Sequence, residues 1–164
     1  MQKLAKLLLA VTLPWMPIAA LAAGSHSGGH GHDDEMAIGR PGAVKEAIRT
    51  IEITMKETAD GAMVFDPAEI DVKKGETVRL AIKNAGELEH EFVMDGSHEI
   101  QEHKTLMEKF PEMEHADPNA VRLQPGQSGE IVWSFTTPGA FEFACLIPGH
   151  YQSGMHGPLN VSRN

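Results

Sequence analysis

Short stretches of alternating hydrophobic and polar residues begin at about residue 48. Ile51, Ile53 and Met55 alternate with polar neighbours, and Ile131 and Trp133 do so later in the chain. A period of two is typical of a strand with one buried face. Gly and Pro turns separate the stretches, so the pattern indicates an all-β antiparallel sandwich or barrel. The expected strands are residues 48–55, 64–65, 70–72, 78–82, 91–94, 128–135, 140–145 and 158–162.

The pattern changes over residues 95–120, where no β-branched run occurs. Ile100, His103, Met107 and Phe110 recur at steps of three and four residues, which is the spacing of one helix face. The proline that follows is expected to end the helix. We therefore expect a partly helical insertion within the β domain.

The first residues have the composition of a secretory signal peptide. Lys3 and Lys6 precede a mostly apolar run at residues 7–21, and Ala20-Leu21-Ala22 is a small-x-small cleavage site. No later segment is apolar enough to span a bilayer, so an exported, soluble, periplasmic protein is expected. The expected organisation is a signal peptide at 1–22, a flexible His-containing tail and arm at 23–47, and a β domain at 48–164.

The chain is acidic. Its formal net charge is -9, and this becomes -11 without residues 1–22, because Lys3 and Lys6 are lost and 12 basic residues remain against 23 acidic ones. Such a charge argues against nucleic acid or an anionic membrane as a partner, and it suits a protein that handles cations or meets a basic partner.

A single cysteine, Cys145, begins the pattern Cys-x4-His-x4-Met, which continues with His150 and Met155, and His90 lies far upstream. Taken singly, a loop histidine is usually solvated, and a methionine or a lone thiol usually belongs to the core. Two imidazoles, a thiolate and a weak axial thioether together form the blue-copper ligand set. Zinc has no use for the methionine. A cysteine-nucleophile enzyme is not indicated, because the chain has no Asn or Asp motif that would orient a histidine base.

Residues 62–164 resemble the cupredoxin family. The segment 65–84 resembles the family's second and third strands, His90 matches its first histidine ligand, and residues 141–157 resemble its ligand loop. The resemblance implies a Greek-key β-sandwich with Cu(I)/Cu(II) chemistry and the metal ligands His90, Cys145, His150 and Met155. With its His-containing tail and its Met/His insertion, the chain is most similar to the periplasmic copper-tolerance cupredoxins of the CopI type.

Two further groups are candidates for additional copper. Three histidines lie within seven residues of the tail, a biased composition typical of metal binding, although a solvated linker is the alternative. In the insertion, Met107 lies on the apolar stripe and suits the core, whereas the segment after the proline is the better ligand candidate. The additional candidate ligands are His26, His30, His32, Met113 and His115.

Copper tolerance is the function these patterns favour, through binding, buffering or passing on copper at a type 1-like site. The alternative is a small electron carrier between redox partners, with Leu146, Ile147 and Pro148 as an apolar docking patch. We expect no enzyme, because four protein ligands leave no open position for a substrate. The expected partners are copper ions and a redox or copper-handling protein.

Overall fold

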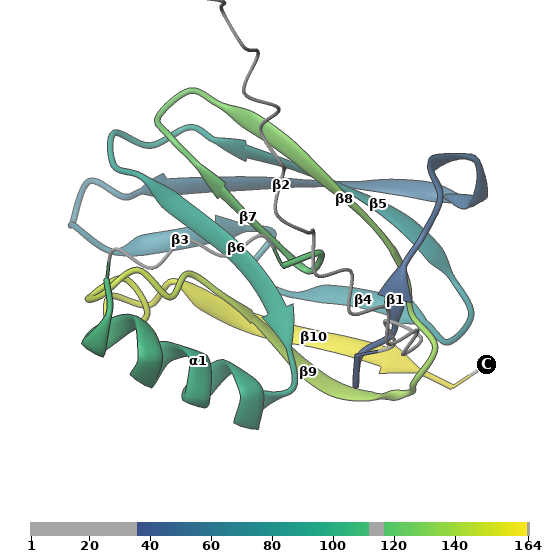
Figure 1. Ribbon diagram of the computed structural model, residues 1–164. Helices are drawn as coiled ribbons and strands as arrows, with labels where there is room; N and C mark the ends of the chain where they lie inside the picture. Colours follow the sequence, from purple (N-terminus) through teal and green to yellow (C-terminus); the bar gives the residue numbers. More distant parts are fainter. Residues whose placement is uncertain (1–35, 112–116, 164) are drawn as a thin grey trace, which may run out of the picture. The chain divides into compact units, whose positions relative to one another are not determined.

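The strands form two five-stranded sheets in a computed structural model, in which the structure describes residues 36–111 and 117–163 (Figure 1). The first sheet has the order β1 (Arg40–Pro41), β8 (Ser128–Ser134), β5 (Thr77–Asn84), β2 (Arg49–Glu57) and β3 (Met63–Asp66). The second has the order β4 (Ile70–Lys73), β10 (His156–Ser162), β9 (Gly139–Ala144), β6 (His90–Asp95) and β7 (Ala120–Leu123). The β-sandwich expected from the alternation is therefore confirmed.

Strand directions differ in part from the antiparallel expectation. Most neighbouring strands are antiparallel, but β2 runs parallel to β5 and β4 runs parallel to β10. After β2 the chain forms β3 in the same sheet, then changes to the other sheet as β4, and returns as β5 beside β2. Crossovers of this kind bring a strand back in its original direction, and hydrophobic alternation alone does not encode them.

The core lies between the two sheets. In β2 and β5 the inward residues Ile53, Met55, Leu80 and Ile82 are at most 1% exposed, as a period of two requires. From the opposite sheet, Phe92 contributes a ring that stacks at 5.7 Å on a second phenylalanine in β9 and meets a third in β3 edge to face. This packing holds the strands that end at the candidate ligands.

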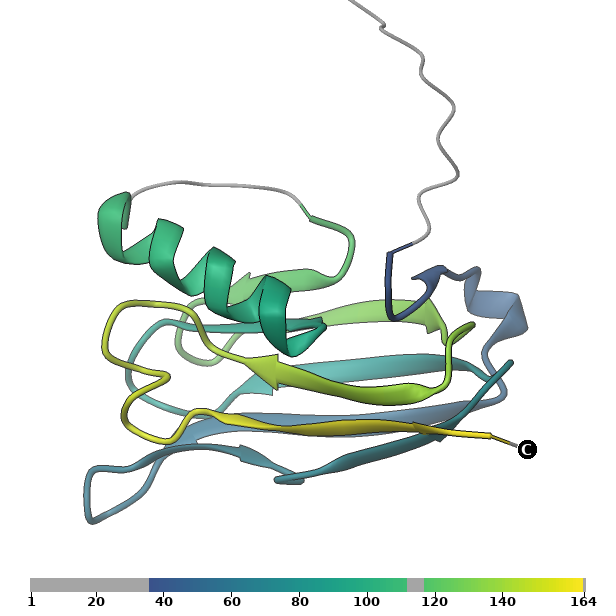
Figure 2. The same cartoon turned by 90° about the horizontal axis from the view of Figure 1, so that it is seen from below.

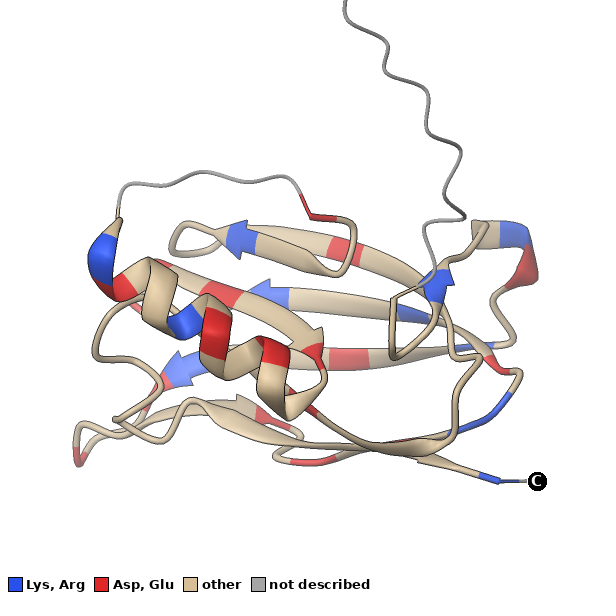
Figure 3. Ribbon diagram, turned by 60° about the horizontal axis from the view of Figure 1, so that its bottom comes forward, with Lys and Arg blue, Asp and Glu red and all other residues tan. Residues whose placement is uncertain are grey.

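The helix α1 (Ser97–Lys109) lies on the outer face of the second sheet, against β6 and β9 (Figure 2). Ile100 and Met107 are fully buried there, in a small cluster with Val93 and Leu146. The core role expected for Met107 is confirmed. Phe110, however, is 56% exposed, because the helix ends at Lys109 and the ring leaves the apolar stripe. The helix α1 carries charges of both signs along its length (Figure 3).

Two packed segments lie outside the expected strands. Ile38, which lies within the expected tail and arm at 23–47, is fully buried in the core, and β1 pairs with β8. The packed chain therefore begins before residue 48. The short strand β7 follows the insertion and pairs with β6.

Candidate metal centre

The C-terminal ligand loop closes on itself through backbone hydrogen bonds. The N–H of Met155 donates to the carbonyl of His150 at 3.1 Å, and the N–H of Cys145 donates to the carbonyl of Met155 at 2.9 Å. A further bond, from the N–H of His150 to the carbonyl of Ile147 at 3.0 Å, tightens the turn. The loop thus brings the three residues of the Cys-x4-His-x4-Met pattern back to the end of β9.

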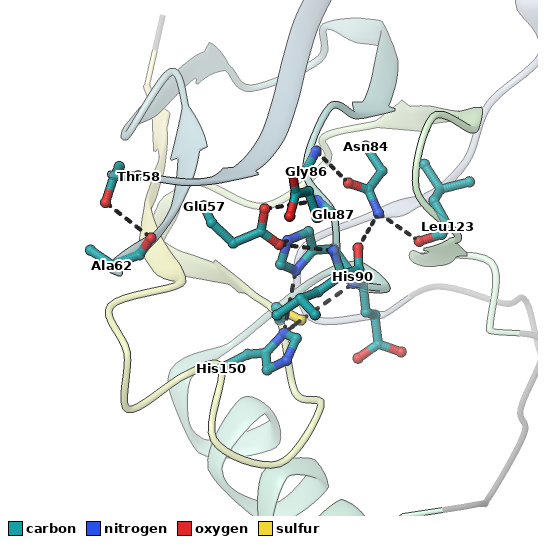
Figure 4. Close-up of polar contacts among 12 residues, drawn as sticks. Glu57, Thr58, Ala62, Asn84, Gly86, Glu87, His90, Leu123 and His150 are labelled. Carbon is teal, nitrogen blue, oxygen red and sulfur yellow. Dashed lines mark hydrogen bonds and ion pairs between the residues drawn. The ribbon is translucent and has the colours of Figure 1, made fainter. Parts of the chain in front are cut away.

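His90 comes to the same place from a different strand. It is the first residue of β6, which pairs directly with β9. Its Nδ1 lies 3.3 Å from Nδ1 of His150 (Figure 4), and Nδ1 of His150 lies 3.4 Å from Sγ of Cys145. Across residues 36–111 and 117–163, these three form the one group of His, Cys, Asp or Glu whose ligand atoms all lie within 4.8 Å of one another.

The spacing of the three atoms suits one metal ion. In a trigonal arrangement with bonds of about 2.0–2.3 Å, neighbouring ligand atoms lie about 3.5–4 Å apart. His90 and Cys145 are fully buried and His150 is 9% exposed, so a metal held here would be shielded from solvent. A soft thiolate with two imidazoles fits copper.

Methionine is the fourth member of the expected set. Met155 is fully buried and belongs to the same core cluster as Cys145. The backbone bond between the two residues keeps them adjacent. Burial of Met155 among apolar side chains suits the weak, soft ligand that the sequence predicts.

Burial sets the protonation of the metal-free site. It raises the pKa of the Cys145 thiol to about 12, against the opposing effect of the hydrogen bond that the N–H of Glu91 donates to Sγ at 3.3 Å. Burial, followed by the neighbouring His90, lowers the pKa of His150. At neutral pH the metal-free site therefore holds a neutral thiol beside a neutral imidazole, and a metal must displace the thiol proton to bind.

Glu57, the last residue of β2, is a site residue that the sequence analysis missed. Its Oε1 lies 2.8 Å from Nε2 of His90, whereas Nδ1 of the same ring lies near His150 (Figure 4). Burial raises the pKa of Glu57, but hydrogen bonds from the N–H groups of Glu87 and Leu88 and from His90 outweigh it and hold the pKa below its usual range. The signal was present, because a charged residue follows Ile53 and Met55 in the core-facing phase of the strand.

The remaining candidates fall into two groups. Of the expected docking patch, Leu146 is buried at 1% exposure because it packs under α1, whereas Pro148 is exposed. The additional copper candidates His26, His30, His32, Met113 and His115 lie outside the described residues.

Comparison with known proteins agrees with this geometry. The profile of the copper-binding proteins of the plastocyanin/azurin family matches residues 52–162. The copper-resistant cuproprotein CopI of Rubrivivax gelatinosus is 50% identical over 137 residues, which cover 84% of this chain and 81% of that protein. The CopI of Pseudomonas aeruginosa is 37% identical over an alignment of 154 residues, which covers 76% of this chain and 82% of that protein.

A solved structure has the same fold. Reduced auracyanin from Roseiflexus castenholzii superposes with a TM-score of 0.58 at 28% identity, covering 71% of this chain and 98% of that one. The cupredoxin resemblance read from the ligand loop is thereby confirmed. The chain belongs to the plastocyanin/azurin family of copper-binding proteins.

Proposed function

We propose that this protein serves copper tolerance in the periplasm by holding copper at His90, Cys145, His150 and Met155. The observation that carries the proposal is the convergence of Sγ of Cys145 with two imidazole Nδ1 atoms in a buried site. The imidazoles and the thiolate would form the strong ligands, and the Met155 thioether would be the weak axial one. Such a set accepts copper in both oxidation states.

Binding, rather than catalysis, is the role this arrangement supports. Four protein donors fill the coordination sphere, and burial of His90 and Cys145 leaves no approach for a substrate. The relatives that cover most of the chain are named copper-resistant cuproproteins. The His-containing tail is a second feature that favours tolerance, because an electron carrier has no need of additional metal ligands.

The exported location rests on the N-terminal pattern. Lys3, Lys6 and the apolar run at 7–21 fit a signal peptide. Within the described parts of the chain, no helix has the length and apolarity needed to cross a membrane.

Electron transfer is the second candidate, and one observation favours it. His150, at 9% exposure, is the one residue of the three-residue group that reaches the surface, and Pro148 beside it is exposed. An electron would leave through such an edge if an apolar partner docked there.

Copper titration of the chain without residues 1–22, followed by visible absorption, tests the proposal. The expected result is a thiolate-to-copper band that saturates at one equivalent and is lost in Cys145→Ala. Binding of further equivalents of copper, lost when residues 24–35 are deleted, would favour copper tolerance. Copper sensitivity of cells that lack the protein would favour it too. One equivalent and normal growth in copper would favour the electron carrier. A chain with no band would refute the copper site.

A further inference from the structure

We propose that Glu57 is a positioning residue of the metal centre, which holds the ring of His90 in the ligating tautomer and stabilises Cu(II) over Cu(I) by its charge. The inference rests on the copper site proposed above. It assigns a role to a residue outside the ligand set, carried by the other sheet of the sandwich.

The contact to His90 determines which ring nitrogen carries the proton. An ionised carboxylate only accepts hydrogen bonds, so Nε2 of His90, 2.8 Å from Oε1 of Glu57, must be the protonated nitrogen. The lone pair is then on Nδ1, the atom that lies 3.3 Å from Nδ1 of His150. Because the ring is fully buried, it has no solvent to provide another partner. A carboxylate on the far nitrogen of a ligating histidine typically fixes both tautomer and orientation.

The loop before β6 is shaped around this carboxylate. The N–H of Glu87 donates to Oε2 of Glu57 at 2.9 Å, and the N–H of Leu88 donates to Oε1 at 3.1 Å. A Cβ added at Gly86 would overlap the carboxylate, so glycine is needed for this approach. The Glu57 side chain is 22% exposed, yet its oxygens accept three hydrogen bonds. It is held in one position relative to His90.

The negative charge of Glu57 lies beside the ring of His90. Among the described residues, no Lys or Arg pairs with it, and the side chain that it contacts is the ring of His90. A negative charge behind a ligand favours the more positive metal ion, so it should strengthen Cu(II) binding more than Cu(I) binding and lower the reduction potential.

Glu57→Gln tests the inference, because it keeps the size of the side chain and removes the charge. We expect Cu(II) affinity to fall about 10–100-fold, as for other outer-shell partners of metal ligands, and Cu(I) affinity to fall less. Each tenfold change in the ratio of the two affinities raises the potential by about 59 mV. Glu57→Asp, which keeps the charge, should recover part of the loss.

The matched control is Glu130→Gln. It changes the net charge by the same amount but removes an exposed carboxylate paired with Arg79. This variant should change neither copper affinity by more than twofold. It should change the reduction potential by no more than about 18 mV, because a twofold change in the affinity ratio corresponds to about 0.3 of the 59 mV that a tenfold change gives. If Glu57→Gln changed the copper affinities and the reduction potential no more than this control does, the charge role of Glu57 would be overturned.

Nitrogen NMR of the metal-free, unmodified chain tests the tautomer without copper and without a variant. We expect His90 to carry its proton on Nε2. A proton on Nδ1 would overturn the positioning role, even if Glu57→Gln failed to fold. Absence of the thiolate-to-copper band in the unmodified chain would instead refute the proposed copper site and the charge role with it, while the NMR result would still decide the tautomer.

Discussion

Replacing Asn84 with alanine should destabilise the metal-free protein because this side chain ties three backbone segments together. Asn84 is fully buried at the end of β5. Its Nδ2 donates to the carbonyls of Leu88 at 2.7 Å and Leu123 at 2.9 Å, and its Oδ1 accepts from the N–H of Gly86 at 2.9 Å. Alanine would leave all three backbone groups without these partners.

The expected loss follows from those three bonds. At about 0.5–1.5 kcal/mol each, they sum to about 1.5–4.5 kcal/mol, a large part of a typical stability of about 5–15 kcal/mol. A loss of about 3 kcal/mol, at an m-value of about 1.5–2 kcal/mol/M, lowers the urea midpoint by about 1.5–2 M. Urea unfolding followed by tryptophan fluorescence would measure it.

Asn160→Ala is the control for this experiment. The Asn160 side chain also makes two hydrogen bonds, to Glu69 at 2.7 Å and to Asp71 at 3.0 Å, but on the exposed surface. Its loss should change the free energy of unfolding by no more than about 0.5 kcal/mol. If the two variants had the same midpoint, buried hydrogen bonding by Asn84 would not be what secures the loop before His90.

Three further predictions concern the site and the pH response. Met155→Leu should shift the reduction potential, measured by redox titration, more than it lowers copper affinity, because the axial bond is weak; a large loss of affinity would contradict this. Copper uptake at pH 7 should release one proton, from Cys145 with its pKa of about 12 and none from His150, whose pKa is lowered; calorimetry in buffers of different ionisation enthalpy measures it, and zero release would refute it. Burial raises the pKa of Glu76, but the hydrogen bonds from Arg49 and from the N–H of Lys73, together with the positive charges of both residues, outweigh it and lower the pKa below 4.5. The contribution of Glu76 to stability is therefore present above pH 4.5 and is lost as pH falls through the folded-state value. The stability difference from Glu76→Gln should shrink over that range, and a constant difference would contradict it.

The sequence was most informative where periodicity and spacing carry the signal. Ile53 and Met55 are buried as their alternation predicts, and α1 buries Ile100 and Met107. The spacing of the ligand loop also predicted which residues meet, because a short loop that starts and ends on neighbouring strands must close. For His90 the prediction needed the family resemblance, since nothing local connects it to Cys145.

Other features depend on tertiary packing, and the hydrophobic pattern of the sequence does not predict them. Strand direction in the two parallel pairs follows from crossovers between sheets, which leave no hydrophobic signature. The four-residue strand β7 buries one side chain, Leu123, which is too little periodicity to identify. Leu146 was assigned to the surface because the loop sequence does not show that α1 covers it.

Glu57 shows what a stricter interpretation of the alternation would have found. It continues the inward phase of Ile53 and Met55, where a charged residue requires a partner. The partner is His90, which comes from the other sheet. A charge in a core-facing phase, at the end of a strand, is therefore a signal of an outer-shell residue when a metal ligand motif occurs elsewhere in the chain.

X-ray absorption at the copper edge of the chain loaded with one equivalent of copper would show whether Cys145 and the two histidines hold the metal. We predict one short copper–sulfur distance from Cys145 and two copper–nitrogen distances from the imidazoles of His90 and His150. The sulfur contribution should vanish in Cys145→Ala. A copper ion surrounded only by nitrogen and oxygen in the unmodified chain would rule out Cys145 as a ligand.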